Sequence, residues 1–324
     1  MMNKIRRRAG IHPGYALALF VFGWMPPAAA CPIPVFQFSL EYWDSDPYEI
    51  AVHHDGDFTE AEQAAVDRLK AAKPVNGGHA NISLTWRDYS RATISPPDDV
   101  ELPRMEVRYP LVSGIRETLW EGPLGLETVE ELLDSPIRRR IAEKLLDRNA
   151  AVWLLLKSGN RSRDRRAERL LKERIAHLEE TLKVPDPGYG MDLGEIHTDI
   201  DFKMLTLDRN DPAERKFIHM LLGAERDLEE YADQPMVFPL YGRGLIMYAL
   251  IGDGINEWTL TSVGEFLTGP CSCQVKQGNP GVDVLMTLDW KGQVERRTTY
   301  GMPAGATGDF LDRVDEAEER LEED

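Results

Sequence analysis

Two cysteines separated by one residue, in Cys271-Ser272-Cys273, carry the most reactive side chains of this chain, and Cys31 is its third cysteine. Thiols at this spacing can close a strained, readily reduced disulfide or hold a soft metal such as Cu(I), with zinc as the other candidate. In an oxidising compartment, one of the pair can instead form a structural disulfide with Cys31. No His or Met ligands lie nearby in the sequence, so we predict no cofactor and keep Cys271 and Cys273 as redox or metal candidates.

The run His53-His54-Asp55-Gly56-Asp57 is the second group whose side chains could do chemistry. Imidazole and carboxylate are ligands for zinc or copper, and histidine also transfers protons near neutral pH. Neighbouring side chains on a strand point to opposite faces, however, so the two histidines are not expected to bind one ion. We therefore favour a solvated strand end here and keep His53, His54 and Asp55 as weaker site candidates.

Acidic residues outnumber basic ones, with 55 Asp and Glu against 38 Lys and Arg and a formal net charge of −17. The average field repels phosphate, so the sequence predicts no nucleic-acid partner. The stretch 161–174 is rich in Lys and Arg but also contains Asp164, Glu168 and Glu173. Mixed signs of this kind favour a solvated helix face with ion pairs such as Glu168 with Lys172. No catalytic signature of a named enzyme class stands out, so an enzyme is not favoured.

The first thirty residues have the layout of a bacterial secretory signal. A basic segment over 4–8 precedes an apolar stretch over 15–25, and small residues end at Ala30. The apolar stretch is far shorter than the roughly 20 residues of a membrane-spanning helix, and no later stretch reaches that length. We therefore predict an exported protein of the periplasm or cell envelope, with residues 1–30 as its signal peptide.

Cys31 follows this signal directly, and its position has two interpretations. Ala28 and Ala30 suit ordinary signal-peptidase cleavage, whereas a cysteine at the cut resembles the bacterial lipobox, although Ala28 stands where a lipobox usually has Leu. A lipid on Cys31 would then be the membrane attachment. Removal of residues 1–30 takes away four positive charges and no acidic residue, which changes the formal charge from −17 to −21.

Hydrophobic periodicity and helix caps predict the elements of the first half. Thr59-x-x-Glu62 and Thr128-x-x-Glu131 have the spacing of capping boxes and predict helix starts, the first for a helix that ends near residue 72. We also expect a short helix over 35–43, strands over 48–54 and 81–86, and an antiparallel pair over 105–109 and 115–120.

The second half repeats this order of elements more plainly. The stretch 151–156 is apolar throughout, which is typical of a central strand in a covered sheet. We also expect helices that begin after Ser135, Asp211 and Ser262, a long charged helix with an apolar face over 170–182, and strands over 202–207, 234–240, 245–251 and 282–290.

The order of strands and helices over 150–269 resembles the thioredoxin fold, in which a cis-proline begins the third strand. Pro235 stands at that position, and a turn with Gly242 and Gly244 follows between the third and fourth strands. The first half resembles this fold less completely, with Pro103 as the counterpart of Pro235 and no helix between its second and third strands. The resemblance implies cis peptide bonds before Pro103 and Pro235.

We therefore predict an α/β fold of two tandem thioredoxin-like units with mixed central sheets. A thioredoxin carries a low-pKa cysteine at a helix N-terminus after its first strand. The matching positions, 53–57 and 158–163, contain no cysteine, so the resemblance implies no dithiol exchange by that route. The expected divisions are a signal peptide (1–30), a degenerate unit (31–134), a second unit (135–269), the Cys-Ser-Cys segment with an added strand (270–301) and an acidic tail (302–324).

The leading hypothesis is an exported, non-catalytic binding or assembly module of the cell envelope, with an envelope protein as its partner. The alternative is a thiol-redox or soft-metal-handling protein that uses Cys271 and Cys273. A third hypothesis is calcium buffering, because the tandem units carry a strong negative charge. The segments 235–239 and 271–276 also make the whole chain similar to a family of exported bacterial proteins, which implies no particular activity.

Overall fold

The computed structural model describes residues 31–74, 77–92, 100–185, 199–271, 276 and 281–300. The described residues from Pro32 onward belong to one compact unit. The predicted signal peptide and acidic tail lie outside the described residues. Within the described ranges, the helices are all too short or too polar to cross a membrane.

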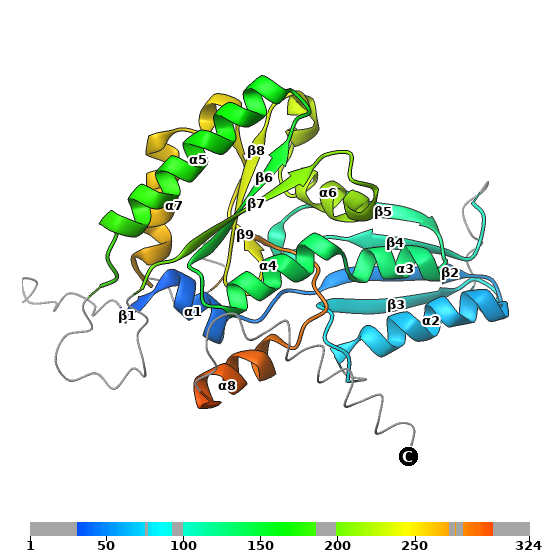
Figure 1. Ribbon diagram of the computed structural model, residues 1–324. Coiled ribbons are helices and arrows are strands. Elements are labelled where there is room, and N and C mark those ends of the chain that lie inside the picture. Colours follow the sequence, from blue (N-terminus) through cyan, green and yellow to red (C-terminus); the bar gives the residue numbers. More distant parts are fainter. Residues whose placement is uncertain are drawn as a thin grey trace, which may run out of the picture. The chain divides into compact units, whose positions relative to one another are not determined.

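The first sheet has four strands in the order β3-β2-β4-β5 (Figure 1). β2 runs parallel to β3 and antiparallel to β4, which pairs antiparallel with β5. The helix α2 (Glu60–Ala72) connects the parallel strands and begins with the predicted capping box, in which Thr59 and Glu62 each accept the other's backbone N–H. The strands are β2 (Tyr48–His54), β3 (Ile82–Asp88), β4 (Arg104–Arg108) and β5 (Thr118–Pro123).

The second sheet has six strands, in the order β12-β9-β8-β6-β7 with β10 paired to β8. β6 is parallel to β7 and antiparallel to β8, and its burial explains its continuous apolar sequence. The chain is thus an α/β protein with two mixed sheets, each of which contains a parallel pair. The strands are β6 (Ala151–Lys157), β7 (Phe202–Asp208), β8 (Met236–Tyr241), β9 (Leu245–Ile246), β10 (Leu250–Ile251) and β12 (Val282–Asp283).

Helices cover both faces of the six-stranded sheet. Trp153 and Leu155 of β6 face a core formed with α1 (Val35–Tyr42), α5 (Arg161–Thr181) and α7 (Glu257–Thr268). Leu154 and Leu156 face the other core, which contains side chains of α4 (Pro136–Leu146) and α6 (Arg215–Leu222). This second core also includes Ile50 of β2 and residues of α2 and α3 (Leu126–Leu133), so it joins the two sheets.

Short elements complete the described part of the chain. The two-stranded sheet pairs β1 (Cys31–Pro34) with β11 (Pro270–Cys271), and α8 (Trp290–Tyr300) follows β12. The described connections contain the 3-10 helices η2 (Leu111–Ser113), η3 (Pro212–Glu214), η4 (Leu228–Tyr231) and η5 (Gly252–Gly254).

Several predicted boundaries differ from the structure. α3 begins after Gly125 rather than at Thr128, and α7 begins after Asn256, which forms its own capping box with Thr259. The Ser/Thr-x-x-Glu pattern at Thr128 and Ser262 therefore lies inside helices, where no free N–H groups need a cap. The predicted strand over 245–251 is divided into β9 and β10, and that over 282–290 is shortened to β12 before α8 begins.

The peptide bonds before the two prolines differ. Among the described residues only the Leu102–Pro103 bond is cis, so the Gln234–Pro235 bond is trans and the expectation for Pro235 is wrong. The segment before β8 leaves η4 directly, with the N–H of Gln234 bonded to the carbonyl of Tyr231. The carbonyl of Pro235 then accepts the N–H of Gly252 at the start of β8.

Candidate functional site

His53 and His54 end β2 and contact different partners. The Nδ1 atom of His53 lies 3.0 Å from the Tyr89 hydroxyl. The Nδ1 atom of His54 lies 2.8 Å from the carbonyl oxygen of Gly56, which only accepts, so this nitrogen carries the proton. The His54 ring also packs on Phe58, with ring centroids 4.5 Å apart. The two imidazoles therefore have different neighbours, as expected for adjacent residues whose side chains point to opposite faces of a strand.

Arg87, His53 and Arg104 lie side by side on β3, β2 and β4, and we call these three residues the Arg-His-Arg row. Arg104 is paired, since its Nη2 atom lies 3.0 Å from the Glu121 carboxylate. The side chain of Arg87 is exposed and has no ion pair or hydrogen bond within the described ranges. The row therefore presents one free guanidinium next to an imidazole at the end of the sheet.

The surroundings of the imidazole in this row disfavour its charged form. Burial lowers the pKa of His53, and the charges of Arg87 and Arg104 act in the same direction, while Glu106 opposes them. The Nε2 atom of His53 lies 3.8 Å from Glu106. Burial would raise the pKa of Glu106, but hydrogen bonds from Arg108 and Thr118 outweigh it and lower that pKa. A neutral imidazole between two guanidinium groups suits an anionic group of a ligand better than a metal cation.

The corresponding loop of the six-stranded sheet, after β6, is closed by its own side chains. The carboxylate of Asp164 accepts the N–H and hydroxyl of Ser158, at 2.9 and 2.8 Å, and the N–H of Gly159 at 3.1 Å. Asn160 caps α5 by accepting the N–H groups of Ser162 and Arg163. Asp164 is buried, and its carboxylate holds the loop between β6 and α5 closed.

Arg209 lies at the end of the neighbouring strand β7. Its Nη2 atom donates to the carbonyl of Gln234 at 3.3 Å, while its buried Nε and Nη1 atoms have no hydrogen-bond acceptor among the described residues. Burial lowers the pKa of Arg209, and the charge of Asp164 opposes this shift. Arg209 is therefore a partly buried guanidinium at the end of β7 with one described hydrogen-bond acceptor.

The segment that follows the cysteine pair is anchored at Lys276. Its ammonium lies 2.9 Å from Asp46 and 2.5 Å from Asp283, and it also donates to the carbonyl of Asp44. Asp283 is buried, and this burial raises its pKa to about 7, although Lys276 pulls the pKa down. Cys273 lies outside the described residues, and of Cys271 only the backbone, in β11, is described.

No metal site forms where the structure can be described. Within these ranges, no three His, Cys, Asp or Glu side chains lie close enough to share an ion. Asp55 and Asp57 are exposed next to the histidines and do not converge with them. The predicted zinc or Cu(I) site at the cysteine pair lies outside the described residues.

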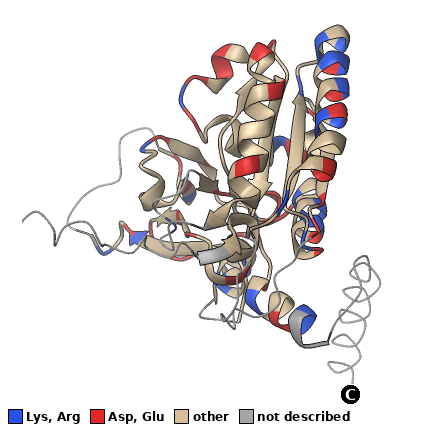
Figure 2. Cartoon of the chain, turned by 90° about the vertical axis from the view of Figure 1, so that its left-hand side faces the viewer, with Lys and Arg blue, Asp and Glu red and all other residues tan. Residues whose placement is uncertain are grey.

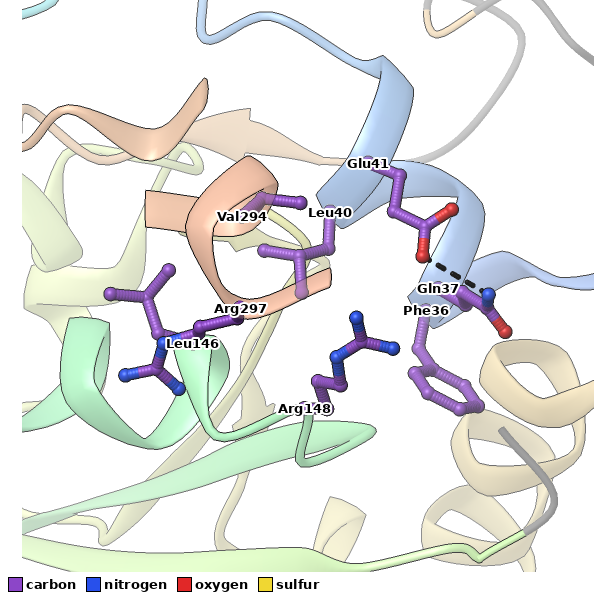
Figure 3. Close-up of a pocket in the computed structure, with 8 residues that line it drawn as sticks. All are labelled: Phe36, Gln37, Leu40, Glu41, Leu146, Arg148, Val294 and Arg297. Carbon is purple, nitrogen blue, oxygen red and sulfur yellow. Dashed lines mark hydrogen bonds between the residues drawn. The ribbon is translucent and has the colours of Figure 1, made fainter. Parts of the chain in front are cut away.

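Two hollows differ greatly in size. The small one, between α1, α4 and α8, encloses only about 10 Å³, which holds at most one water molecule (Figure 3). On its lining, Gln37 donates a hydrogen bond to the Glu41 carboxylate. Burial raises the pKa of Glu41. A groove of about 800 Å³ lies between the β4–β5 connection and the segment after α6. Carboxylates dominate its charged lining: Glu117, Glu225, Asp227, Glu229 and Glu230.

Comparison of the chain with protein-family models, with curated proteins and with solved structures gave no match.

The sequence analysis did not predict that the side chains of four residues are bonded to other parts of the chain: Asp164, Arg209, Lys276 and Asp283. Each of them is bonded to a residue of another element, and only Asp164 has its partners nearby in the sequence. The one available signal was an acidic residue in the first turn of a helix that follows a buried strand, at Asp164. An acidic residue at this position is usually attributed to a favourable interaction with the helix dipole. The sequence alone therefore does not indicate that Asp164 also accepts hydrogen bonds from the preceding loop.

Proposed function

We propose that this chain is a non-catalytic binding or assembly module made of two tandem thioredoxin-like units. The strand orders of both sheets support this. In each sheet, one strand has a parallel neighbour on one side and an antiparallel neighbour on the other, and a helix (α2 or α5) connects the parallel pair. The thioredoxin fold has the same order of parallel and antiparallel neighbours.

The observation that carries the non-catalytic part is the content of the loops after β2 and β6. A thioredoxin needs a thiolate at this place, whereas these loops contain His54, Gly56 and Ser158, Gly159. Their polar groups bond within the loop, through His54 to Gly56 and through Asp164 to Ser158. Neither loop has a thiol for dithiol exchange by the thioredoxin route.

The Arg-His-Arg row supports binding as the remaining role. It lies on the first sheet, next to the loop after β2, and offers the free guanidinium of Arg87. A planar guanidinium recognises carboxylates through paired hydrogen bonds. We infer that the partner is an envelope protein that presents carboxylate side chains to this row.

The location in the periplasm or cell envelope is part of the proposal and is supported by the sequence of residues 1–30 and by Cys31. Export is tested by fractionation and N-terminal sequencing of the protein from a bacterial host. We expect a mature chain that begins at Cys31, with or without a lipid on that residue. A chain that keeps Met1 and stays in the cytoplasm would remove the envelope from the proposal.

The absence of dithiol chemistry is tested with a disulfide-reduction assay on the full chain. We expect no turnover above background, and no change in the Cys271→Ser variant. A robust reductase or isomerase activity that disappears in Cys271→Ser would overturn the non-catalytic proposal.

Binding at the row is tested with a photo-crosslinking residue at Thr85, which is exposed on β3 two residues before Arg87. We expect one defined envelope protein to be captured in cells, and less of it when Arg87→Ala and Arg104→Ala are introduced together. The control variant Arg116→Ala, in an exposed connection, should leave the yield unchanged. Capture that does not depend on Arg87 and Arg104 would contradict binding at this row.

A thiol or soft-metal function remains the second candidate, favoured by one feature. Cys271 is the last residue of β11, and Lys276, five residues further along the chain, forms ion pairs with Asp46 and Asp283. Intact mass spectrometry of the native protein, with and without reductant, tests this function. A reversible Cys271–Cys273 disulfide or a bound metal supports it, whereas a permanent disulfide between Cys31 and one cysteine of the pair, with no metal bound, excludes it.

A further inference from the structure

The helix α5 carries a group of arginines that no described acidic side chain neutralises. Three basic residues over 161–174 have partners: Arg163 with Asp233, Lys172 with Glu168, and Arg174 with Thr261. The others are exposed, and their side chains have no hydrogen bond or ion pair in the part of the chain that the structure describes: Arg161, Arg165, Arg166 and Arg169. In Figure 2, α5 accordingly has blue bands along its length, whereas the neighbouring α7 has none.

We call these four residues the α5 arginine face. Arg161, Arg165 and Arg169 follow each other at intervals of four residues, so they form a row of about 12 Å along the helix. Like charges at this spacing destabilise a helix, and positive charges in its first turn oppose the helix dipole. The helix keeps an arrangement that its own stability disfavours, which is expected where a counter-charge binds.

The groove of about 800 Å³ between the β4–β5 connection and the segment after α6 is the negative counterpart, and we call it the acidic groove. Its lining is partly apolar, with Leu119 and Leu222, and Tyr231 beside it is 47% exposed. Arginine stems pack on apolar and aromatic surface while their guanidinium groups pair with carboxylates. Three carboxylates of this lining have no side-chain bond to any described residue: Asp227, Glu229 and Glu230.

The α5 arginine face and the acidic groove cannot meet within one molecule. α5 packs on the face of the six-stranded sheet that bears Trp153, whereas α6, which leads into the groove, packs on the opposite face with Leu154 (Figure 1). Ala167 and Leu171 bury the other side of α5, so its arginines point away from the sheet. The opposite charges can therefore pair only between two molecules.

The charge of the whole chain makes the position of these arginines significant. A formal net charge of −17 repels a second copy at long range. At an ionic strength of about 0.15 M the Debye length is about 8 Å, so repulsion between distant charges is screened more than ion pairs in contact. Two acidic molecules can then associate where a local positive surface of one meets a negative surface of the other. Every copy of this chain carries both surfaces.

We propose that the α5 arginine face of one molecule docks into the acidic groove of a second copy of this chain. Because the two surfaces differ, each molecule can use both at once. The contact therefore repeats head to tail and produces rings or open chains, not a symmetric dimer. It uses neither the Arg-His-Arg row nor the cysteine pair, so it goes beyond the function proposed above and its test is separate from those tests.

Sedimentation equilibrium of the full chain tests the association. Reductant is present, so that the cysteines form no disulfide between molecules. We expect the weight-average mass to rise at least about two-fold between about 1 and 100 µM protein at about 0.15 M salt. In 1 M salt, where the Debye length is about 3 Å, it should remain that of one chain. A chain that stays monomeric throughout this concentration range at the lower salt would overturn the proposal.

Two sets of neutral substitutions locate the contact. The arginine variant carries Arg161→Gln, Arg165→Gln and Arg169→Gln, and the groove variant carries Asp227→Asn, Glu229→Gln and Glu230→Gln. Each variant alone should associate at least about ten-fold more weakly, because several ion pairs are lost together. An equimolar mixture should form a complex of two chains, since the groove variant keeps its arginines and the arginine variant keeps its groove.

Matched controls change charge elsewhere on the surface. Arg140→Gln on α4 and Glu60→Gln on α2 remove exposed charges and should leave the association unchanged. A mixture of the arginine and groove variants that stays monomeric would contradict a contact between unlike surfaces. Association that neither set of substitutions weakens more than the controls would show that the copies meet elsewhere, and it would likewise refute the proposal.

Discussion

Two buried charged residues, Arg138 and Glu214, lie at the start of α4, and the local sequence does not predict the role of either. Ser135 precedes the helix and Pro136 opens it as predicted, yet the Ser135 side chain makes no capping bond. The cap comes instead from Glu214, whose carboxylate accepts the N–H of Ile137 at 2.6 Å. Burial raises the pKa of Glu214, and nearby Arg138 opposes that shift. A cap supplied from η3, after β7, depends on the tertiary fold and cannot be predicted from spacing.

Arg138 ties α4 to the C-terminal end of α3. Its guanidinium donates to the Ser135 hydroxyl and to the carbonyls of Glu131, Leu132 and Leu285, at 2.8 to 3.0 Å. Burial lowers its pKa to about 10, so it remains charged at neutral pH. The carbonyls of Glu131 and Leu132 belong to the last turn of α3, which has no helical N–H to bond them.

Arg138→Met should therefore lower the free energy of unfolding by about 3 kcal/mol, because it leaves several buried acceptors without a donor. Arg140→Met removes an exposed arginine of the same helix and should change the free energy of unfolding by less than about 0.5 kcal/mol. Urea denaturation followed by circular dichroism measures both values. Equal effects of the two substitutions would show that the four hydrogen bonds of Arg138 do not contribute to stability.

The buried Asp283 should make stability depend on pH. The groups that face it are Lys276, which pairs with its carboxylate, the backbone N–H of Asp46, and the Tyr48 hydroxyl, which donates to its carbonyl. Its pKa in the folded chain, about 7, is above the value of 3.8 for an unperturbed Asp. The folded state therefore holds a proton that the unfolded state has lost, so this contribution to stability is lost as the pH rises from about 4 through 7.

Asp283→Asn removes this titration. Relative to the unsubstituted chain, the variant should gain roughly 2 kcal/mol in unfolding free energy between pH 5 and pH 8. The exposed control Asp201→Asn should show no such gain. Urea denaturation at the two pH values measures the difference, and a variant that follows the unsubstituted chain at both would contradict the raised pKa.

At the scale of elements, the sequence predicts strands and helix caps that depend on neighbouring residues. It does not predict features that depend on how elements pack against each other. The strand over 48–54 and the capping box at Thr59 are found as predicted, because alternation and capping are local. The start of α7 was missed because Asn256 and Thr259 form a less common capping box than the pattern at Ser262 suggests. At the candidate site, the position of His53 was predictable, but its place between Arg87 and Arg104 depends on strand register, which is set by tertiary packing.

The loop between β6 and α5 depends on one carboxylate. Asp164 accepts three hydrogen bonds from Ser158 and Gly159, and Gly159 has a φ of +88°, which an L side chain rarely adopts. Asp164→Ala should lower the free energy of unfolding by about 2 kcal/mol, because the loop N–H groups lose their acceptor. It should also speed amide hydrogen exchange over 158–164, while the exposed control Glu173→Ala leaves both unchanged. Unaltered exchange in this loop would show that Asp164 does not close it.

At the scale of the molecule, the two sheets contact each other directly and are not two separate units connected only by the chain. Tyr48 of the first sheet donates to the carbonyl of Asp283 at 2.6 Å, and Tyr109, just after β4, donates to the carbonyl of Met220 in α6 at 2.9 Å. Both hydroxyls are buried, so breaking either bond leaves unsatisfied polar groups. These contacts were not foreseen from the repeated order of elements, since each half by itself has the pattern of a separate unit.

This shared core predicts that the two sheets unfold together. Ile50 of β2 is fully buried in the cluster that also contains Leu154 of β6. Ile50→Ala should lower the free energy of unfolding by about 3 kcal/mol, whereas Leu111→Ala, which is 76% exposed, should have little effect. If the two sheets form one cooperative unit, a substitution in the first sheet also speeds hydrogen exchange in the second. The slowest-exchanging amides of β6 should then exchange roughly 100-fold faster in Ile50→Ala. Faster exchange confined to β2, β3, β4 and β5 would instead show two units that fold independently, and hydrogen exchange followed by mass spectrometry separates these outcomes.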